Sequence, residues 1–195
     1  ARIAKYIANK WKLFHLDSGI LYRRLSSIII KNNINLNDTN KIHALLKNIQ
    51  EISPRNENKL RTEKISNAAS KIATNKKIRD FINNQQKIIV KNQLKFRGCI
   101  IDGRDIGSVV FKKANIKIYV VVDEIIRAKR RHKQLIDIGE KSIYAKILKE
   151  IKLRDKKDKL RKNSPLVKPR GAFILNNSNS FSDTIKQINK IMESK

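Results

Sequence analysis

The chain has 195 residues, of which 40% are hydrophobic, so it is long enough for one α/β domain with its own core. Its 45 basic and 17 acidic residues give a formal net charge of +28, but the excess is spread along the whole chain and accompanies many isoleucines and asparagines, as A/T-rich codons produce. The charge therefore does not make nucleic acid the expected main partner, although a basic patch remains a reason to consider one.

Cysteine and hydropathy patterns exclude two further classes of protein. The single cysteine, Cys99, cannot form an internal disulfide and fits a reducing compartment. No apolar run approaches the ~20 residues of a membrane span, and the first residues carry no signal-peptide core. We expect a cytoplasmic protein that does not enter a membrane and is a monomer.

Hydrophobic periodicity predicts helices and strands that alternate along the chain. Capping is expected from Asp38 or Thr39, Asn75 and Asp123, and Gly139 is expected to end a helix. Helices are expected at about 1–10, 20–30, 42–49, 62–72, 76–94, 124–138, 141–160 and 181–192, and buried strands at 13–16, 99–101, 116–122 and 172–175. This alternation indicates βαβ units and a parallel sheet.

The stretch 98–111 is the main candidate for a site. A short apolar strand leads into a turn in which Gly103 and Gly107 are expected to break regular structure around Arg104 and Asp105. Ligands of open α/β sheets bind at the carboxyl ends of the strands. There a guanidinium can hold a phosphate bidentately and a carboxylate can accept from an exocyclic amine. The alternative is a surface turn in which the two side chains pair.

A second candidate is the charged helix near 141–160. Arg154, Asp158 and Arg161 are spaced by four and three residues and so share one face. On the residues alone these are ion pairs of a solvated helix, and the basic run from Arg127 to Lys133 is a solvated face. The three histidines have no metal-binding spacing.

Taken together, several motifs resemble those of bacterial cytidylate kinases, which are P-loop nucleoside monophosphate kinases. They occur in the family's order over nearly the whole chain. The motifs are Leu16-Asp17-Ser18-Gly19 with Tyr22-Arg23; Arg61-Thr62 and Ser66-Asn67-Ala68-Ala69-Ser70; Arg79; Ile101-Asp102-Gly103-Arg104-Asp105-Ile106-Gly107 to Phe111; Arg127 with Arg130-Arg131; and Arg154-Asp155, Asp158, Arg161 and Pro165-Leu166.

The resemblance implies phosphoryl transfer from ATP to CMP or dCMP with Mg²⁺, a reaction that depends on positioning and charge stabilisation. It implies a single kinase domain over 1–195 with a P-loop NTPase-like, three-layer α/β fold, a monophosphate-binding insert at 36–61 and a lid at 123–165. By similarity, the CMP phosphate would be clamped by Arg23, Arg104 and Arg161. The cytosine base would be read by Ser70, Arg79 and Asp105, with Ser18 nearby, and the ribose would be surrounded by Tyr22, Arg154 and Asp158. The ATP phosphates would be met by Arg127, Arg130 and Arg131, and the hydration shell of Mg²⁺ would be held by Asp102.

Two features depart from the family pattern. The phosphate loop, Gly-x-x-x-x-Gly-Lys-Ser/Thr, does not occur, so we expect about 15 to 20 residues, the central strand and this loop, to be missing before Ala1. A truncated gene model, a start site placed too late and a degenerate paralogue are the alternatives, and the retained CMP-side residues favour the first two. The insert at 36–61 is also short and helical, where the family usually has a small β-rich insert.

Other functions remain open at this stage. A basic RNA- or ribosome-binding protein would suit the charge and the absent phosphate loop, but such a module concentrates basic and aromatic residues on one element, and aromatic residues make up only 6% of this chain. A catalytically inactive paralogue that retains CMP binding, or a UMP kinase, is also compatible with the sequence.

Overall fold

A computed structural model describes residues 2–55, 57–137 and 139–194. The chain divides into two compact units, Ala1–Gly103 and Arg104–Lys195. Each unit contains helices and a short parallel sheet, which confirms an α/β class of structure. That all 195 residues act as a single kinase domain stays a prediction.

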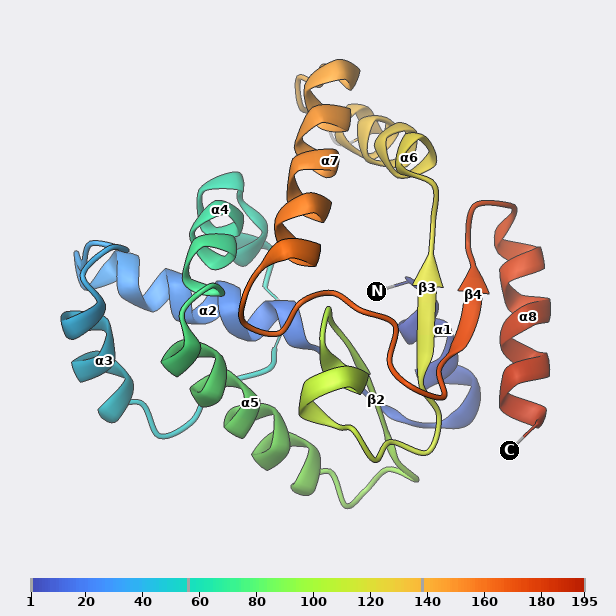
Figure 1. Cartoon of the computed structure of the whole chain (residues 1–195), viewed down its shortest axis with the longest axis horizontal. Coiled ribbons are helices and arrows are strands. Elements are labelled where there is room, and N and C mark those ends of the chain that lie inside the picture. The colour runs from blue at the N-terminus through green and yellow to red at the C-terminus, as the bar shows by residue number, and fades with distance from the viewer. Residues whose placement is uncertain (1, 56, 138, 195) are drawn as a thin grey trace. The chain divides into compact units, whose positions relative to one another are not determined.

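The first unit packs a two-stranded sheet with several helices (Figure 1). Strands β1 and β2 are parallel, with Phe14 opposite Cys99 and Asp17 opposite Asp102. The elements in chain order are α1 (Arg2–Trp11), β1 (Phe14–Asp17), α2 (Ser18–Lys31), α3 (Thr39–Lys47), the 3₁₀ turn η1 (Asn58–Arg61), α4 (Glu63–Ile72), α5 (Lys76–Lys91) and β2 (Cys99–Asp102).

Side-chain caps begin four of these helices. Asp38 accepts from the Lys41 amide at the start of α3, and Asn75 accepts from the Ile78 amide at the start of α5, as the sequence predicts. Thr62 caps α4 in the same way through the amide of Ile65. Asp17 caps α2 through the amide of Gly19, so α2 begins immediately after β1.

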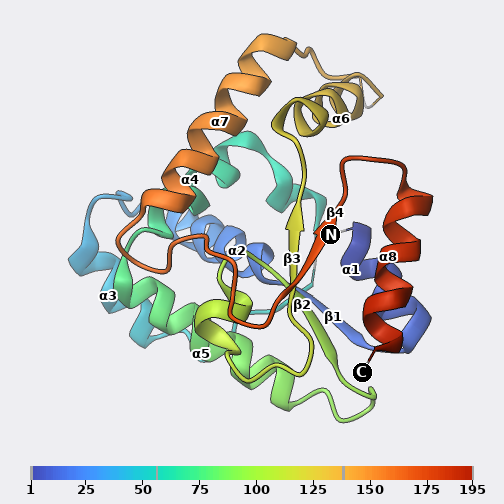
Figure 2. The same cartoon turned by 45° about the vertical axis from the view of Figure 1, so that its right-hand side comes forward.

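The core of the first unit is centred on α2 and α5. Leu21, Leu25 and Ile29 recur on one face of α2 and are completely buried, as is Ile82 of α5. Helix α4 packs against α2, and both views show the two side by side (Figures 1 and 2). This packing fixes the helix that carries Ser18, Tyr22 and Arg23.

The second unit has a parallel pair of strands with α8 beside β4 and the helices α6 and α7 packed on each other (Figure 2). Asp123 caps α6 through the amides of Ile125 and Ile126, and Gly139 follows it with φ +77°, both as predicted. The elements are the short π-helical turn η2 (Ile106–Val110), β3 (Ile118–Val121), α6 (Glu124–Asp137), α7 (Tyr144–Leu160), β4 (Phe173–Asn176) and α8 (Phe181–Glu193).

The structure corrects three details of the predicted elements. Strands β2 and β3 are only half-buried, because each pairs with a single strand among the described residues. Helix α5 ends at Lys91 rather than near Leu94, because Asn92 closes it as the C-cap. Gly107 does not break regular structure. It lies inside η2, where an added Cβ would come within 3.1 Å of the Pro169 ring.

None of the helices in the described parts of the chain combines the length and the apolar character that a bilayer crossing requires.

We expect Ile82→Ala to lower the free energy of unfolding of the first unit by about 2–5 kcal/mol. The substitution removes methylene groups from a fully buried position of α5 and leaves a cavity in the core. Urea unfolding followed by circular dichroism measures the loss. The exposed Lys87→Ala on the same helix is the control, and an equal effect of both substitutions would contradict the assignment of the core.

Candidate functional site

A buried carboxylate in the second unit is surrounded by three arginines. Asp158 is 9% exposed, and its Oδ1 lies 3.2 Å from Nη1 of Arg161. Its Oδ2 lies 3.3 Å from Nε of Arg104 and 4.0 Å from Nε of Arg154. The structure therefore brings together four of the predicted site residues, from the stretch after β2 and from the end of α7.

Local structure explains why these side chains meet. Arg154 and Asp158 are one helical turn apart on α7, and Arg161 is its C-cap residue. The chain then turns back, because the Arg161 guanidinium donates to the carbonyl of Ser164 and the Leu166 amide donates to the carbonyl of Asp158. Ser164 takes the left-handed conformation, with φ +52°, to make this turn.

The cluster has an excess of positive charge. Three guanidinium groups lie within 4.0 Å of the Asp158 carboxylate, and the next carboxylate that acts on Arg154 and Arg104, Asp155, is itself paired with Arg127. Desolvation and then repulsion from Arg104 lower the pKa of Arg154, although its half-exposed side chain limits this effect and it stays charged. Such an arrangement favours a bound dianion such as a monoester phosphate.

Arginines of the predicted lid make contacts within the second unit. Arg127 of α6 forms a bidentate pair with Asp155 of α7, at 3.0 and 2.5 Å. Arg130 donates to the carbonyls of Asn177 and Asn179, at 2.8 and 3.0 Å, in the loop between β4 and α8. Arg131 donates to the side chain of Gln134 on its own helix. Of these three arginines, Arg130 contacts a loop at the carboxyl end of a strand, the loop that follows β4.

The pair between Arg127 and Asp155 joins α6 to α7. Burial raises the pKa of Asp155, but the hydrogen bonds and charge of Arg127 outweigh burial and hold that pKa below its usual value. The same hydrogen bonds raise the pKa of Arg127. Two donors on two acceptors fix the helices more firmly than a single contact would.

The first unit gathers a second group of predicted residues at the start of α2. Arg79 of α5 is 3% exposed, donates to the carbonyl of Ala73 and lies over the Tyr22 ring at 5.8 Å. Arg23 donates to the carbonyl of Leu60, at 3.4 Å, and Ser18 is buried at the first position of α2. Ser70 is exposed on α4, which packs against α2.

The predicted carboxylates Asp102 and Asp105 belong to different units. Asp102, the last residue of β2, lies 3.3 Å from Nε2 of His15 on the neighbouring strand. Asp105 is buried in the second unit, and its carbonyl accepts from Val109 and Val110. The predicted grouping of Asp105 with Ser70 and Arg79 stays a prediction. No group of three metal-ligating side chains occurs among the described residues.

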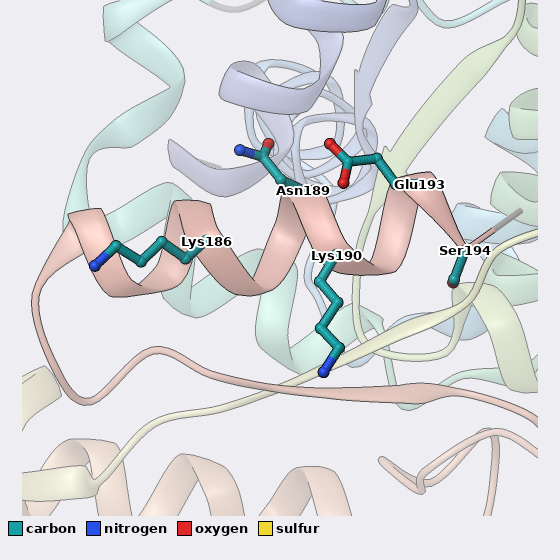
Figure 3. A pocket seen from close by; sticks show the side chains of 5 residues that line it. All are labelled: Lys186, Asn189, Lys190, Glu193 and Ser194. Carbon is teal, nitrogen blue, oxygen red and sulfur yellow. The ribbon is translucent and has the colours of Figure 1, made fainter.

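Other features were not predicted as parts of the site. Asp155 binds Arg127, 28 residues away, and Arg24 binds Ser53, 29 residues away. No rule based on local spacing detects contacts over such separations. The pocket in Figure 3 lies along α8 and contains none of the predicted residues. It is lined by Lys186, Asn189, Lys190, Glu193 and Ser194.

Comparison with known proteins identifies the family. A model of the cytidylate kinase family matches residues 1–194. The chain belongs to this family. It is 36% identical to a cytidylate kinase of Fusobacterium nucleatum, over 98% of this chain and 90% of that protein. Cytidylate kinases of Thermosipho melanesiensis and Rickettsia rickettsii are 32% and 36% identical over 99% of this chain, and 91% and 86% of their own lengths are covered.

We expect Asp155→Asn to lower the free energy of unfolding by about 1–2 kcal/mol at pH 7, because it weakens the bidentate pair with Arg127. The folded-state pKa of Asp155 lies below its usual 3.8. The contribution of the pair is therefore full above about pH 5, where the carboxyl is also ionised in the unfolded chain, and is lost as the pH falls through the lowered pKa.

Urea unfolding of the second unit at pH 7 and pH 3 measures this effect, with Asp137→Asn at the exposed end of α6 as the control. The variant Asp155→Asn should lose less stability between the two pH values than the parent chain. The same acid sensitivity in both would show that the pair does not stabilise the unit.

Proposed function

We propose that this chain is a nucleoside monophosphate kinase that transfers the γ-phosphoryl group of ATP to CMP or dCMP. The observation that carries the proposal is the convergence of Arg104, Arg154 and Arg161 on the buried Asp158, with its surplus of positive charge. Phosphoryl transfer requires little covalent chemistry from the protein and much positioning and charge stabilisation. Membership of the cytidylate kinase family supports the same reaction.

The acceptor residues are those that the family resemblance assigns. Arg23, Arg104 and Arg161 would hold the phosphate of CMP, because guanidinium groups match phosphate oxygens bidentately. Asp158 and Arg154, with Tyr22, would contact the ribose, and Ser70, Arg79 and Asp105, near Ser18, would read the cytosine edge. Arg79 and Asp105 are buried, and buried donors and acceptors give this kind of selectivity, since a wrong base leaves them unpaired.

The donor would bind to the lid arginines and Mg²⁺. Arg130 would reach the ATP phosphates from α6, with Arg127 and Arg131 beside it. Asp102 fits the metal, because it is a partly exposed carboxylate whose side chain is 27% accessible and whose orientation His15 fixes. Bound Mg²⁺ would supply neutralising charge to the phosphate oxygens.

The groups that hold the donor phosphates in P-loop kinases are not in this sequence. No Gly-x-x-x-x-Gly-Lys-Ser/Thr occurs in the 195 residues, and that loop supplies the backbone N–H groups and lysine that cradle the phosphates. We propose that turnover requires a strand and a phosphate loop preceding Ala1, and that a P-loop NTPase-like sheet forms around that strand. The proposed protein is a cytoplasmic monomer.

The first test is a coupled assay of ADP release with CMP, UMP and AMP as acceptors. It compares this chain with a version extended upstream by a strand and a phosphate loop. We expect turnover with CMP in the extended version and at most weak CMP binding by the present chain. Absence of turnover in both, together with RNA binding that weakens steeply with salt, would instead support a nucleic-acid-binding protein.

The second test concerns the arginine cluster. In the form of the chain that turns over CMP, we expect Arg104→Ala to raise the KM for CMP by about 10- to 100-fold, because it removes a charge-assisted contact to the phosphate, while the KM for ATP changes little. Arg170→Ala, an exposed arginine of the same unit, is the matched control. Equal KM values for CMP in the two variants would show that Arg104 does not bind the acceptor.

A further inference from the structure

The segment 50–61 of the first unit, described at residues 50–55 and 57–61, has little regular structure apart from η1 at its end, and side chains from two helices bind its described residues. Gln85 of α5 is buried, donates to the carbonyl of Gln50 and accepts from the Ile52 amide, both at 2.9 Å. Ile52 and Leu60 are each 1% exposed and anchor the segment in the core. Such a segment depends on side chains to satisfy its backbone groups.

Arg24 of α2 binds the middle of this segment with three hydrogen bonds. Its Nε donates to the carbonyl of Ser53 at 2.9 Å, and its Nη2 donates to the carbonyl of Arg55 at 2.6 Å and to the Glu57 carboxylate at 2.8 Å. The side chain is only 17% exposed. A planar guanidinium offers donors in several fixed directions, whereas an ammonium group does not have this fork.

Glu57 remains charged in this arrangement. Hydrogen bonds from Lys59 and then from Arg24 lower its pKa to about 2. Lys59 lies 2.6 Å from the second carboxylate oxygen. The contact between α2 and the segment therefore persists over the whole neutral pH range.

The same segment ends at residues that contact Arg23 and Asp17. The carbonyl of Leu60 in η1 accepts from Arg23, the arginine that we assign to the CMP phosphate. Arg61 lies 3.6 Å from Asp17, which caps α2 immediately before Ser18. Arg23 and Arg24 are neighbours on α2, so one arginine binds the middle of the segment and the other donates to a carbonyl near its end.

We propose that Arg24 is a positioning residue for CMP binding. It holds the segment 50–61 against α2, so that the carbonyl of Leu60 keeps the Arg23 guanidinium oriented toward the acceptor phosphate. Arg24 itself does not touch the substrate. This inference rests on the proposed function, because it assigns Arg24 to the site that binds CMP.

The test is Arg24→Lys, which retains the charge but loses the fork. Arg97→Lys makes the same chemical change at an exposed position of the same unit and is the matched control. Both are made in the form of the chain that turns over CMP in the assay above. The measurements are the KM for CMP, the KM for ATP, kcat, and amide hydrogen exchange of residues 50–61.

We expect Arg24→Lys to raise the KM for CMP by about 10-fold, with little change in the KM for ATP, and to accelerate exchange in the segment. Arg97→Lys should change neither. Faster exchange with an unchanged KM for CMP would overturn the proposal, since Arg24 would then be purely structural. An unchanged exchange rate and an unchanged KM would overturn it as well.

A second variant covers the case in which Arg24→Lys does not fold. Glu57→Gln leaves the two carbonyl acceptors of Arg24 in place, so we expect a smaller rise in the KM for CMP, about 2- to 3-fold. No rise with this variant would count against the proposal. If the parent chain neither binds nor phosphorylates CMP, the proposed function is wrong. If the parent chain phosphorylates CMP and the variants have the same KM for CMP as the parent, only the role of Arg24 is wrong.

Discussion

The buried carboxylate of Asp158 is the interaction on which the second unit's candidate site depends. The guanidinium groups of three arginines lie within 4.0 Å of the Asp158 carboxylate. Without a negative charge between them, these three groups would repel one another strongly. Asp158 lowers this repulsion while its position at the end of α7 keeps it from solvent. It therefore allows the cationic groups to be assembled before a ligand arrives, so less reorganisation is needed when an anion binds.

Arginine has three structural uses in this chain, so the number of arginines alone does not show how many of them bind a ligand. In the Asp158 cluster the guanidinium groups exceed the negative charge. In the pair of Arg127 with Asp155 the charges balance and the contact joins two helices. At Arg24 and Arg130 the main acceptors are backbone carbonyls of irregular segments. The first arrangement suits ligand binding, and the other two suit the support of loops and helices.

Much of the secondary structure follows from local sequence. Asp38, Asn75 and Asp123 cap the helices that the pattern places after them, and Gly139 takes the left-handed conformation after α6. These are interactions over a few residues, and the spacing of Asp158 with Arg154 on α7 and with the C-cap residue Arg161 is equally local. The approach of Arg104 to Asp158 follows from the family resemblance rather than from spacing. The contacts of Arg24 and Asp155 depend on tertiary packing and could not be predicted in this way.

The close approach of Gly107 to Pro169 has a consequence for how this sequence can vary. Even a methyl group at position 107 would meet a rigid ring at 3.1 Å, and the turn that contains it follows directly on Arg104 and Asp105. An alanine at this position would thus shift either the turn or the proline loop. A larger residue at position 107 is tolerable only if position 169 also changes, so the two positions should covary. Pro169 therefore constrains which residues can follow the Asp-Gly-Arg-Asp motif, although it lies far from that motif in the sequence.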